Sequence, residues 1–196
     1  MCLVPLDLPG VSRGKPLDKL GQRPLNQGEI FFDDVRIPAT YMVVGPEVYA
    51  RVVEQVLTYA NAWMGVTFVG LARAALELAL DYAKTRIQGG VPIVTHQSVK
   101  TRLFDMFTRV EAARALARRV LLYNTTHLEP LLQYAIASKV FCTTTAFEVA
   151  NTALQIFGGY GLSRDFPMEK LLRDARASLI EDGCNEVLSL MGATRL

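Results

Sequence analysis

The chain has 196 residues, of which 51% are hydrophobic and 20% are charged, a composition typical of a globular protein with a substantial core. Its 21 basic and 19 acidic residues give a formal charge of +2 at pH 7. Because these charges are well mixed along the chain, no basic tract is available to follow a phosphate backbone, and nucleic acid is not an expected partner.

The first forty residues have the pattern of strands and turns. They hold five of the nine prolines and the alternating run GEIFFDDVRIP. We therefore predict a short β segment over residues 1–42. So few residues supply only two or three strands, which are marginal alone. Either another chain completes this β segment, or the sequence is the back part of a longer protein.

After Pro46 the pattern becomes helical, with apolar residues three and four positions apart. The proline and glycine positions divide this part into five predicted helices, over 47–86, over 95–123 with Thr95 as N-cap, over 130–157 ending at a Gly-Gly pair, from Pro167, and after Gly183. We predict a mainly α protein in which residues 43–196 form an antiparallel four-helix bundle domain.

The cysteines and the N-terminus set further expectations. Cys2, Cys142 and Cys184 are far apart and form no CxxC pair, so neither a disulfide framework nor a metal site is expected. The chain has no basic segment followed by a long apolar run, and no unbroken apolar stretch of about 18 residues. These patterns predict a cytoplasmic protein without a membrane span.

Near the C-terminus stands the run QIFGGYGLSRDFPMEKLLRDARASLIEDGCNEVL. It resembles the C-terminal signature of the acyl-CoA dehydrogenase family, which combines Gln-x-x-Gly-Gly-x-Gly, Arg-Asp-Ala-Arg and a Glu-Gly turn. PGVSRGKPLDKLGQRPLNQGEIFFDDVRIP resembles the end of that family's β-barrel domain, and ARAALELALDYAKTRIQGGVPIVTHQSVKTRLFDM resembles its first two bundle helices. The resemblance covers nearly the whole chain but only the back half of a typical member.

The resemblance implies FAD-dependent oxidation of an acyl-CoA thioester, in which a base removes the α-proton while the β-hydrogen leaves as hydride to the flavin. The protein's part is to hold flavin and base on opposite sides of the reacting bond. It also implies an electron-transfer flavoprotein or another acceptor as partner. The expected assembly is a homo-oligomer, dimer or tetramer, or a complex with a chain that supplies the front half.

The family's flavin contacts carry over onto three stretches of this sequence. Arg86 corresponds to the arginine that reaches the FAD pyrophosphate of a neighbouring subunit; by itself it could equally be a cation at a helix C-terminus. In the family's Arg-x-x-Phe-Gly turn Gly89 replaces the phenylalanine. The full set of predicted cofactor contacts is Arg86, Gln88, His96, Gln97, Gln155, Ile156, Phe157, Gly158, Gly159, Cys184, Asn185 and Glu186.

The two adjacent carboxylates are candidates for the base. A gap-free match on Gly183, the predicted substrate contact, puts Asp182 where the family has its catalytic glutamate and Glu181 where a tyrosine is common. Asp182 is thus the preferred base and Glu181 the second candidate, although the aspartate side chain is one methylene shorter. Without the resemblance, both would be interpreted as acids facing water at a helix N-terminus.

The resemblance leaves the substrate open. Many family members carry a CoA-contacting arginine at the position of Asn61. Some relatives, such as nitroalkane oxidases, use an aspartate base and no CoA. The open alternatives are therefore an acyl-CoA dehydrogenase, an oxidase of the same fold with a non-CoA substrate, and a non-catalytic truncated or assembly subunit.

Overall fold

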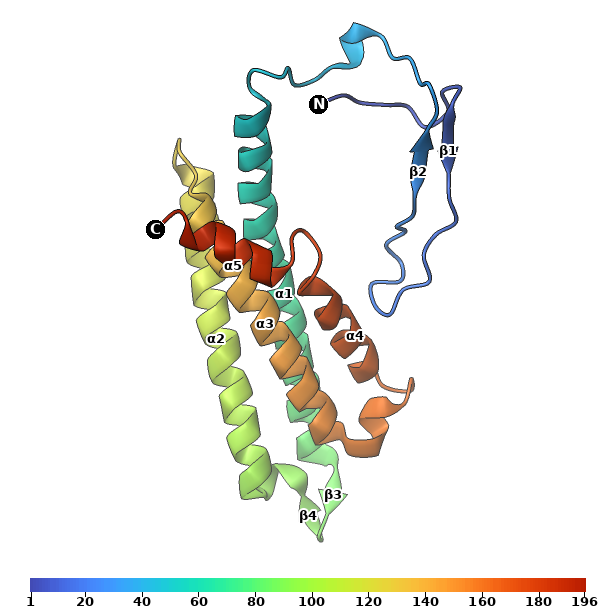
Figure 1. The fold of residues 1–196 in the computed structure, drawn as a ribbon. Coiled ribbons are helices and arrows are strands. Elements are labelled where there is room, and N and C mark those ends of the chain that lie inside the picture. The colour runs from blue at the N-terminus through green and yellow to red at the C-terminus, as the bar shows by residue number, and fades with distance from the viewer.

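The computed structural model describes all residues from Met1 to Leu196. Three long helices stand side by side, one short helix lies across them, another lies beside them, and the N-terminal segment loops away from one end (Figure 1). The helices are α1 (Tyr49–Thr85), α2 (Gln97–Thr126), α3 (Leu132–Phe157), α4 (Met168–Ser178) and α5 (Asn185–Ala193). The prediction of a mainly helical bundle is confirmed.

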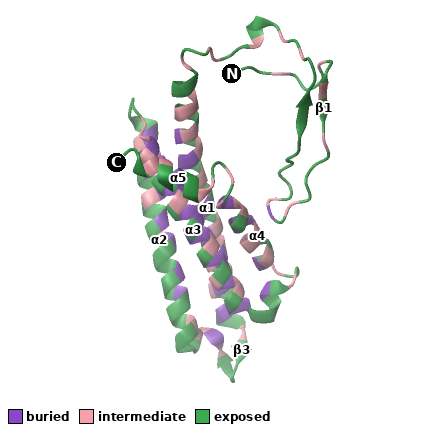
Figure 2. Cartoon of the chain, in the orientation of Figure 1, coloured by how far each residue is buried: buried purple, intermediate pink, exposed green.

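The N-terminal segment, residues 1–48, is an open hairpin. Strands β1 (Val11–Arg13) and β2 (Ile30–Phe32) pair antiparallel, with Ser12 opposite Phe31. Three consecutive β2 residues, Ile30, Phe31 and Phe32, are each about half exposed, so neither face of the strand is covered. Figure 2 shows this segment almost entirely as exposed and intermediate residues. A lone strand pair buries too little apolar surface to be stable by itself.

The bundle core is made from small side chains. α1 packs against both α2 and α3, and α4 and α5 each pack on α3. Alanines recur every three or four residues on the facing sides, which lets the backbones approach closely. These buried alanines are Ala72, Ala75, Ala79 and Ala83 on α1 and Ala146, Ala150 and Ala153 on α3. α1 and α3 also lie close together at Gly65, where an added Cβ would lie 2.4 Å from Ser138 Oγ.

By length and composition alone, α1 could cross a membrane, since an 18-residue window has a mean hydropathy of 1.4. Core helices of soluble proteins share these properties. In this fold the small-residue side of α1 is covered by α2 and α3, as in a core helix.

The helix ends agree with the sequence in part. α3 ends at Gly158, whose φ of 60° is a left-handed conformation suited to glycine, as predicted. The prediction of Thr95 as the N-cap of α2 was wrong. His96 holds the N-cap position, and Thr95 lies in a 3-10 turn, Ile93–Thr95, where its hydroxyl donates to Pro92 O. A β-branched hydroxyl residue can cap either turn, and the sequence does not choose between them.

A short β-hairpin with a two-residue turn links α1 to α2. Strands β3 (Ile87–Gln88) and β4 (Val91–Pro92) pair antiparallel around Gly89 and Gly90, whose φ angles are 64° and 80°. Both turn positions thus need left-handed backbone, which glycine adopts without steric cost. Gly89, at the position of the family's phenylalanine, therefore suits the conformation of this turn.

Candidate functional site

The end of the bundle below α1 and α3 carries an open pocket of about 710 Å³. Its wall comes from the last turn of α1, the β3–β4 hairpin, the first turn of α2 and the turn after α3. Seven of the predicted cofactor contacts line it: Arg86, Gln88, His96, Ile156, Phe157, Gly158 and Gly159. Gln97 and Gln155 lie at the same end of the bundle, each one residue from the lining, and are exposed.

Backbone and aromatic contacts position Arg86. As the C-cap of α1 its backbone N–H donates to Tyr82 O, and its carbonyl accepts from Ile93 N across the hairpin. The guanidinium carbon lies 5.4 Å from the centre of the Tyr160 ring, a cation–π distance. The guanidinium is thus held by its face, and its N–H groups remain available to an anion.

The pocket floor is a cluster of stacked rings. Tyr82 stacks on Phe157 at 4.2 Å between ring centres, and Phe166 meets both rings edge-on. Gly158 and Gly159 lie at the rim, and a Cβ added to either would meet no atom within 4 Å. The pocket therefore combines an apolar floor, a cation and backbone that a ligand can approach closely.

The remaining predicted residues meet elsewhere, at the turn between α4 and α5. Asp182 and Gly183 both adopt left-handed backbone, with φ of 51° and 99°. Cys184 is the N-cap of α5, and Asn185 and Glu186 begin the helix. An aspartate in this conformation is unusual and requires support from the surrounding structure.

The two carboxylates have different surroundings. Glu181 Oε1 accepts a hydrogen bond from Gln22 Nε2 of the N-terminal segment, and the backbone N–H of Gln22 donates to Asp174 Oδ1. The Asp182 side chain is exposed, and Gln22 makes no hydrogen bond to it. The structure thus shows that Glu181 is hydrogen-bonded whereas Asp182 is free, a difference that the sequence could not reveal.

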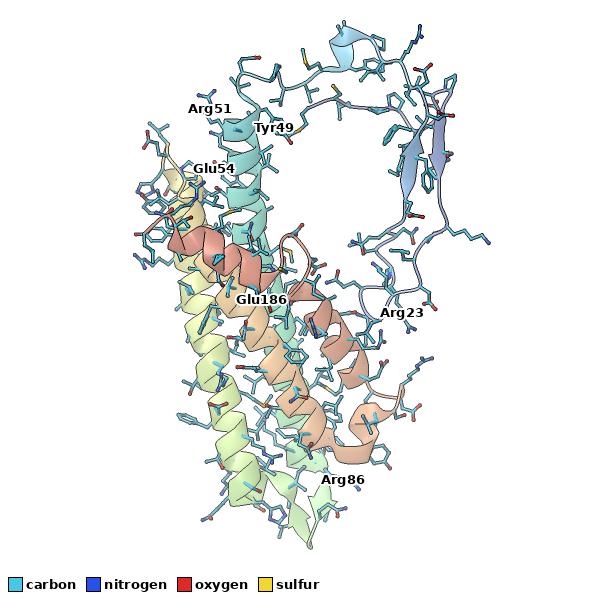
Figure 3. The ribbon with its side chains drawn as sticks, in the orientation of Figure 1. Arg23, Tyr49, Arg51, Glu54, Arg86 and Glu186 are labelled. Atoms are coloured by element: carbon cyan, nitrogen blue, oxygen red, sulfur yellow. The ribbon has the colours of Figure 1, made fainter.

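The pocket and the turn lie far apart on one chain. Figure 3 shows Arg86 at the lower end of the bundle and Glu186 beside the α4–α5 turn. α3 connects the two regions, with Lys139 behind the turn and Gly158 at the pocket, and at 1.5 Å per residue about 28 Å of helix separates these positions. One chain therefore presents two separate groups of predicted site residues.

Residues 50–196 match the family model "Acyl-CoA dehydrogenase, C-terminal domain". The chain belongs to the acyl-CoA dehydrogenase family. It is 34% identical over 194 residues to the probable acyl-CoA dehydrogenase YngJ of Bacillus subtilis, covering 99% of this chain and 51% of that protein. It is 32% identical to the mitochondrial short-chain specific acyl-CoA dehydrogenase of Bos taurus, over 99% of this chain and 47% of the relative.

Solved acyl-CoA dehydrogenases share the fold. Butyryl-CoA dehydrogenase from Megasphaera elsdenii superposes with a TM-score of 0.94 at 31% identity, over 99% of this chain and 50% of the other. The chain thus spans about half the length of the acyl-CoA dehydrogenases that it matches. The chain therefore belongs to a family of oxidoreductases.

Asn61, at the position where many acyl-CoA dehydrogenases carry a CoA-contacting arginine, is fully buried inside the bundle. Its amide nitrogen donates to Leu57 O of the preceding turn, and its Oδ1 has no hydrogen-bond partner. A side chain enclosed in this way contributes no charge to the surface. At this position the chain has no cation for CoA.

Sequence reasoning missed one residue at the turn, Lys139 of α3. It is fully buried, and its ammonium donates to Gly183 O and to Asn185 Oδ1, both at 2.8 Å. Burial lowers the pKa of Lys139, and the nearby acidic groups, first Glu181 and then Asp182, partly oppose this effect. Helical spacing could have indicated it, because Lys139 falls on the same helix side as the buried Ala135 and Cys142.

Proposed function

We propose that this chain acts in a FAD-dependent dehydrogenase that oxidises acyl-CoA thioesters between their α and β carbons, with Asp182 as the base. The observation that carries the proposal is the turn before α5. There an exposed aspartate directly precedes a left-handed glycine, while the adjacent Glu181 is held by Gln22. A general base must be free to reach the proton that it removes. Asp182 meets this requirement better than Glu181.

The pocket at the bundle end has the chemistry to hold the anionic part of FAD. Arg86 offers guanidinium N–H groups, the start of α2 offers the backbone N–H groups of Gln97 and Ser98, which have no backbone partner, and the two rim glycines leave the backbone open. The aromatic floor suits an apolar or ring-shaped ligand part. The residues present thus fit a dinucleotide with a pyrophosphate.

When bound, the flavin would accept the hydride from the β carbon. The chain's own task is to place a carboxylate at the α-proton and to bind the cofactor's phosphates. Asp182 would take the proton at a carboxylate oxygen, and Gly183 would let the substrate approach the backbone closely. Cys184, Asn185 and Glu186 would contact the flavin from the start of α5.

Two copies of the chain would share each flavin. Because about 28 Å of α3 separates the pocket from the turn, we infer that the turn of one copy faces the flavin whose phosphates lie in the pocket of another. This arrangement predicts a homodimer or homotetramer. An electron-transfer flavoprotein or another acceptor would reoxidise the cofactor.

A second candidate function is the oxidation of a non-CoA substrate with an acidic C–H bond. It is favoured by the buried, uncharged Asn61 at the CoA-arginine position and by the shorter Asp182 at the base position. A carboxylate shorter by one methylene reaches about 1.5 Å less far. A smaller substrate that comes closer to the backbone would compensate for this loss.

The decisive experiment expresses the chain together with the coding sequence directly upstream of it and purifies the product in the presence of FAD. We expect a yellow oligomer whose flavin absorbance is bleached anaerobically by at least one acyl-CoA from a panel of chain lengths. Nitroalkanes in the same panel test the second candidate. A product that stays colourless with FAD overturns the enzyme proposal and leaves a non-catalytic assembly subunit.

A further inference from the structure

We propose that Lys139 is a positioning residue for the base: by holding Gly183 O and Asn185 Oδ1, its buried ammonium keeps the Asp182–Gly183 turn in its left-handed conformation. The inference rests on the proposed function for the role of Asp182. The contact itself stands on the geometry of α3 and the turn.

Lys139 lies in the interior of the protein. Lys139 is among the largest fully buried side chains of the chain, and its ammonium reaches the turn from the N-terminal half of α3. Burying an ammonium is costly unless it is hydrogen-bonded. Both partners within bonding distance belong to the turn and are uncharged oxygens, at 2.8 Å each. The turn thus supplies the hydrogen bonds that this buried charge requires.

Lys139 belongs to a hydrogen-bond network that joins the start of α5 to α3. Asn185, which accepts from Lys139, donates in turn to Thr143 Oγ1 at 3.0 Å and to Thr144 Oγ1 at 3.3 Å, both on α3. Its backbone N–H donates to Leu179 O across the turn. The start of α5 is therefore anchored to α3 through one buried cation and two hydroxyls. Connected networks of this kind hold one geometry more firmly than isolated bonds.

These hydrogen bonds restrain the backbone of the turn before α5. Two consecutive left-handed residues, Asp182 and Gly183, make the turn, and only the second is a glycine. The left-handed conformation is unfavourable for a residue that carries a Cβ, so it persists only where the surrounding structure holds it. The hydrogen bond to Gly183 O acts on the peptide unit directly after Asp182. Lys139 therefore stabilises the turn in which Asp182 is exposed.

The same turn has a second support on its other side. Gln22 of the N-terminal segment holds the Glu181 carboxylate. Gln22 thus hydrogen-bonds to Glu181 and Lys139 to Gly183, the residues on either side of Asp182, and Asp182 itself stays free. This is the arrangement expected for a carboxylate that must stay accessible and yet be fixed within a fraction of an ångström.

The first test measures hydrogen exchange of backbone amides in the purified 196-residue chain, which needs neither flavin nor substrate. Lys139→Met keeps most of the side-chain volume and removes the ammonium. We expect the amides of residues 181–188 to exchange at least about tenfold faster, with little change in the middle of α1. The matched control is Ser138→Ala, a buried neighbour on α3 whose hydroxyl pairs with Cys142 Sγ and not with the turn.

Asn185→Ala provides a second variant in case Lys139→Met does not fold. It removes one acceptor of the ammonium and both links to the threonines, and we expect faster exchange in the same window. Unchanged exchange over residues 181–188 in a folded variant overturns the proposal. A uniform increase along the whole bundle also overturns it, because that result indicates general loss of packing.

The second test uses the flavin-loaded assembly and measures deuterium exchange at the substrate α carbon. Because misplacing a catalytic group by about 1 Å costs on the order of a hundredfold in rate, Lys139→Met should lower kcat about a hundredfold with KM within about twofold. A raised KM with unchanged kcat overturns the positioning role. An inactive wild-type assembly contradicts the proposed function alone, and the hydrogen-exchange test on the chain still decides the role of Lys139.

Discussion

The pocket at the bundle end and the turn before α5 use positive charge in opposite ways. Arg86 lies at a pocket rim, with its guanidinium over the Tyr160 ring and its N–H groups open to a ligand. Lys139 is fully buried, and its N–H groups are directed to the backbone and side chain of its own chain. A cation at a pocket rim serves binding, whereas a buried and internally bonded cation serves geometry. Substitutions at the two regions should therefore change different measurements.

The largest expected effect concerns the base at the turn. Asp182→Asn should lower α-proton exchange by about 10²–10⁴-fold, the range for loss of a general base, without changing flavin content. The matched control is Glu181→Gln, which should stay within a few-fold of wild type because Gln22 engages that carboxylate. Deuterium incorporation into substrate measures both. An unaffected rate in Asp182→Asn would show that this residue is not the base.

The next effect belongs to the pocket. Arg86→Ala should weaken FAD binding about 10- to 100-fold, because a hydrogen bond to a charged group contributes about 1.5–3 kcal/mol. Lys84→Ala serves as control, since Lys84 is a cation in the last turn of α1 that pairs with Asp81 outside the pocket. Titration of FAD fluorescence measures the affinity. Equal losses in both variants would indicate a general charge effect instead of a phosphate contact.

A smaller effect is expected where the N-terminal segment meets the bundle. Gly21 is the only buried residue of that segment, and a Cβ there would lie 2.3 Å from Arg173 O. Gly21→Ala should destabilise this contact by about 1–3 kcal/mol, as overpacking does. Hydrogen exchange should rise over residues 19–29 and at the turn, where Gln22 holds Glu181, and not at the pocket.

The control for Gly21→Ala is Gly70→Ala in α1, where an added Cβ meets no atom within 4 Å. Alanine in a helix interior is more stable than glycine by roughly 0.5–1 kcal/mol, so this variant should be slightly stabilised. If Gly21→Ala exchanges like wild type, the segment does not depend on this contact.

The smallest expected effect is the pH dependence of stability that Lys139 causes. Burial lowers the pKa of Lys139 in the folded chain below its ordinary value of 10.5. At a pH between the folded-state pKa and 10.5, the unfolded chain therefore binds more protons than the folded chain. The free energy of unfolding of wild type relative to Lys139→Met should therefore rise with pH across that window. Chemical denaturation at several pH values measures it, and a flat difference would contradict the buried charge.

Cys142 acts in the opposite direction but does not obscure this comparison. Burial raises the pKa of its thiol from 9.0 to about 11, so the unfolded chain loses this proton first and stability falls as pH rises through that interval. Both proteins carry Cys142, and its contribution cancels in their difference. Cys142→Ala should remove the alkaline loss from either protein.

Much of the fold was predictable because it depends on local patterns. Alanines and leucines at helical spacing predicted α1 and α3, and the Gly-Gly pair predicted where α3 ends. The start of α2 was not predictable in detail, because Thr95 belongs to a 3-10 turn that ends directly before His96, and propensity does not specify such a turn. The family signature located most of the pocket residues, since their order along the chain carries the resemblance.

The sequence by itself determined the family, the helical class and two adjacent carboxylates before Gly183. Only the tertiary structure decided which carboxylate is free, because Gln22 reaches Glu181 from a segment more than 150 residues earlier. It also decided the role of Lys139, whose partners lie 44 and 46 residues away. A one-dimensional pattern reports the preferences of neighbouring residues, whereas hydrogen bonds between distant segments exist only after the chain has folded.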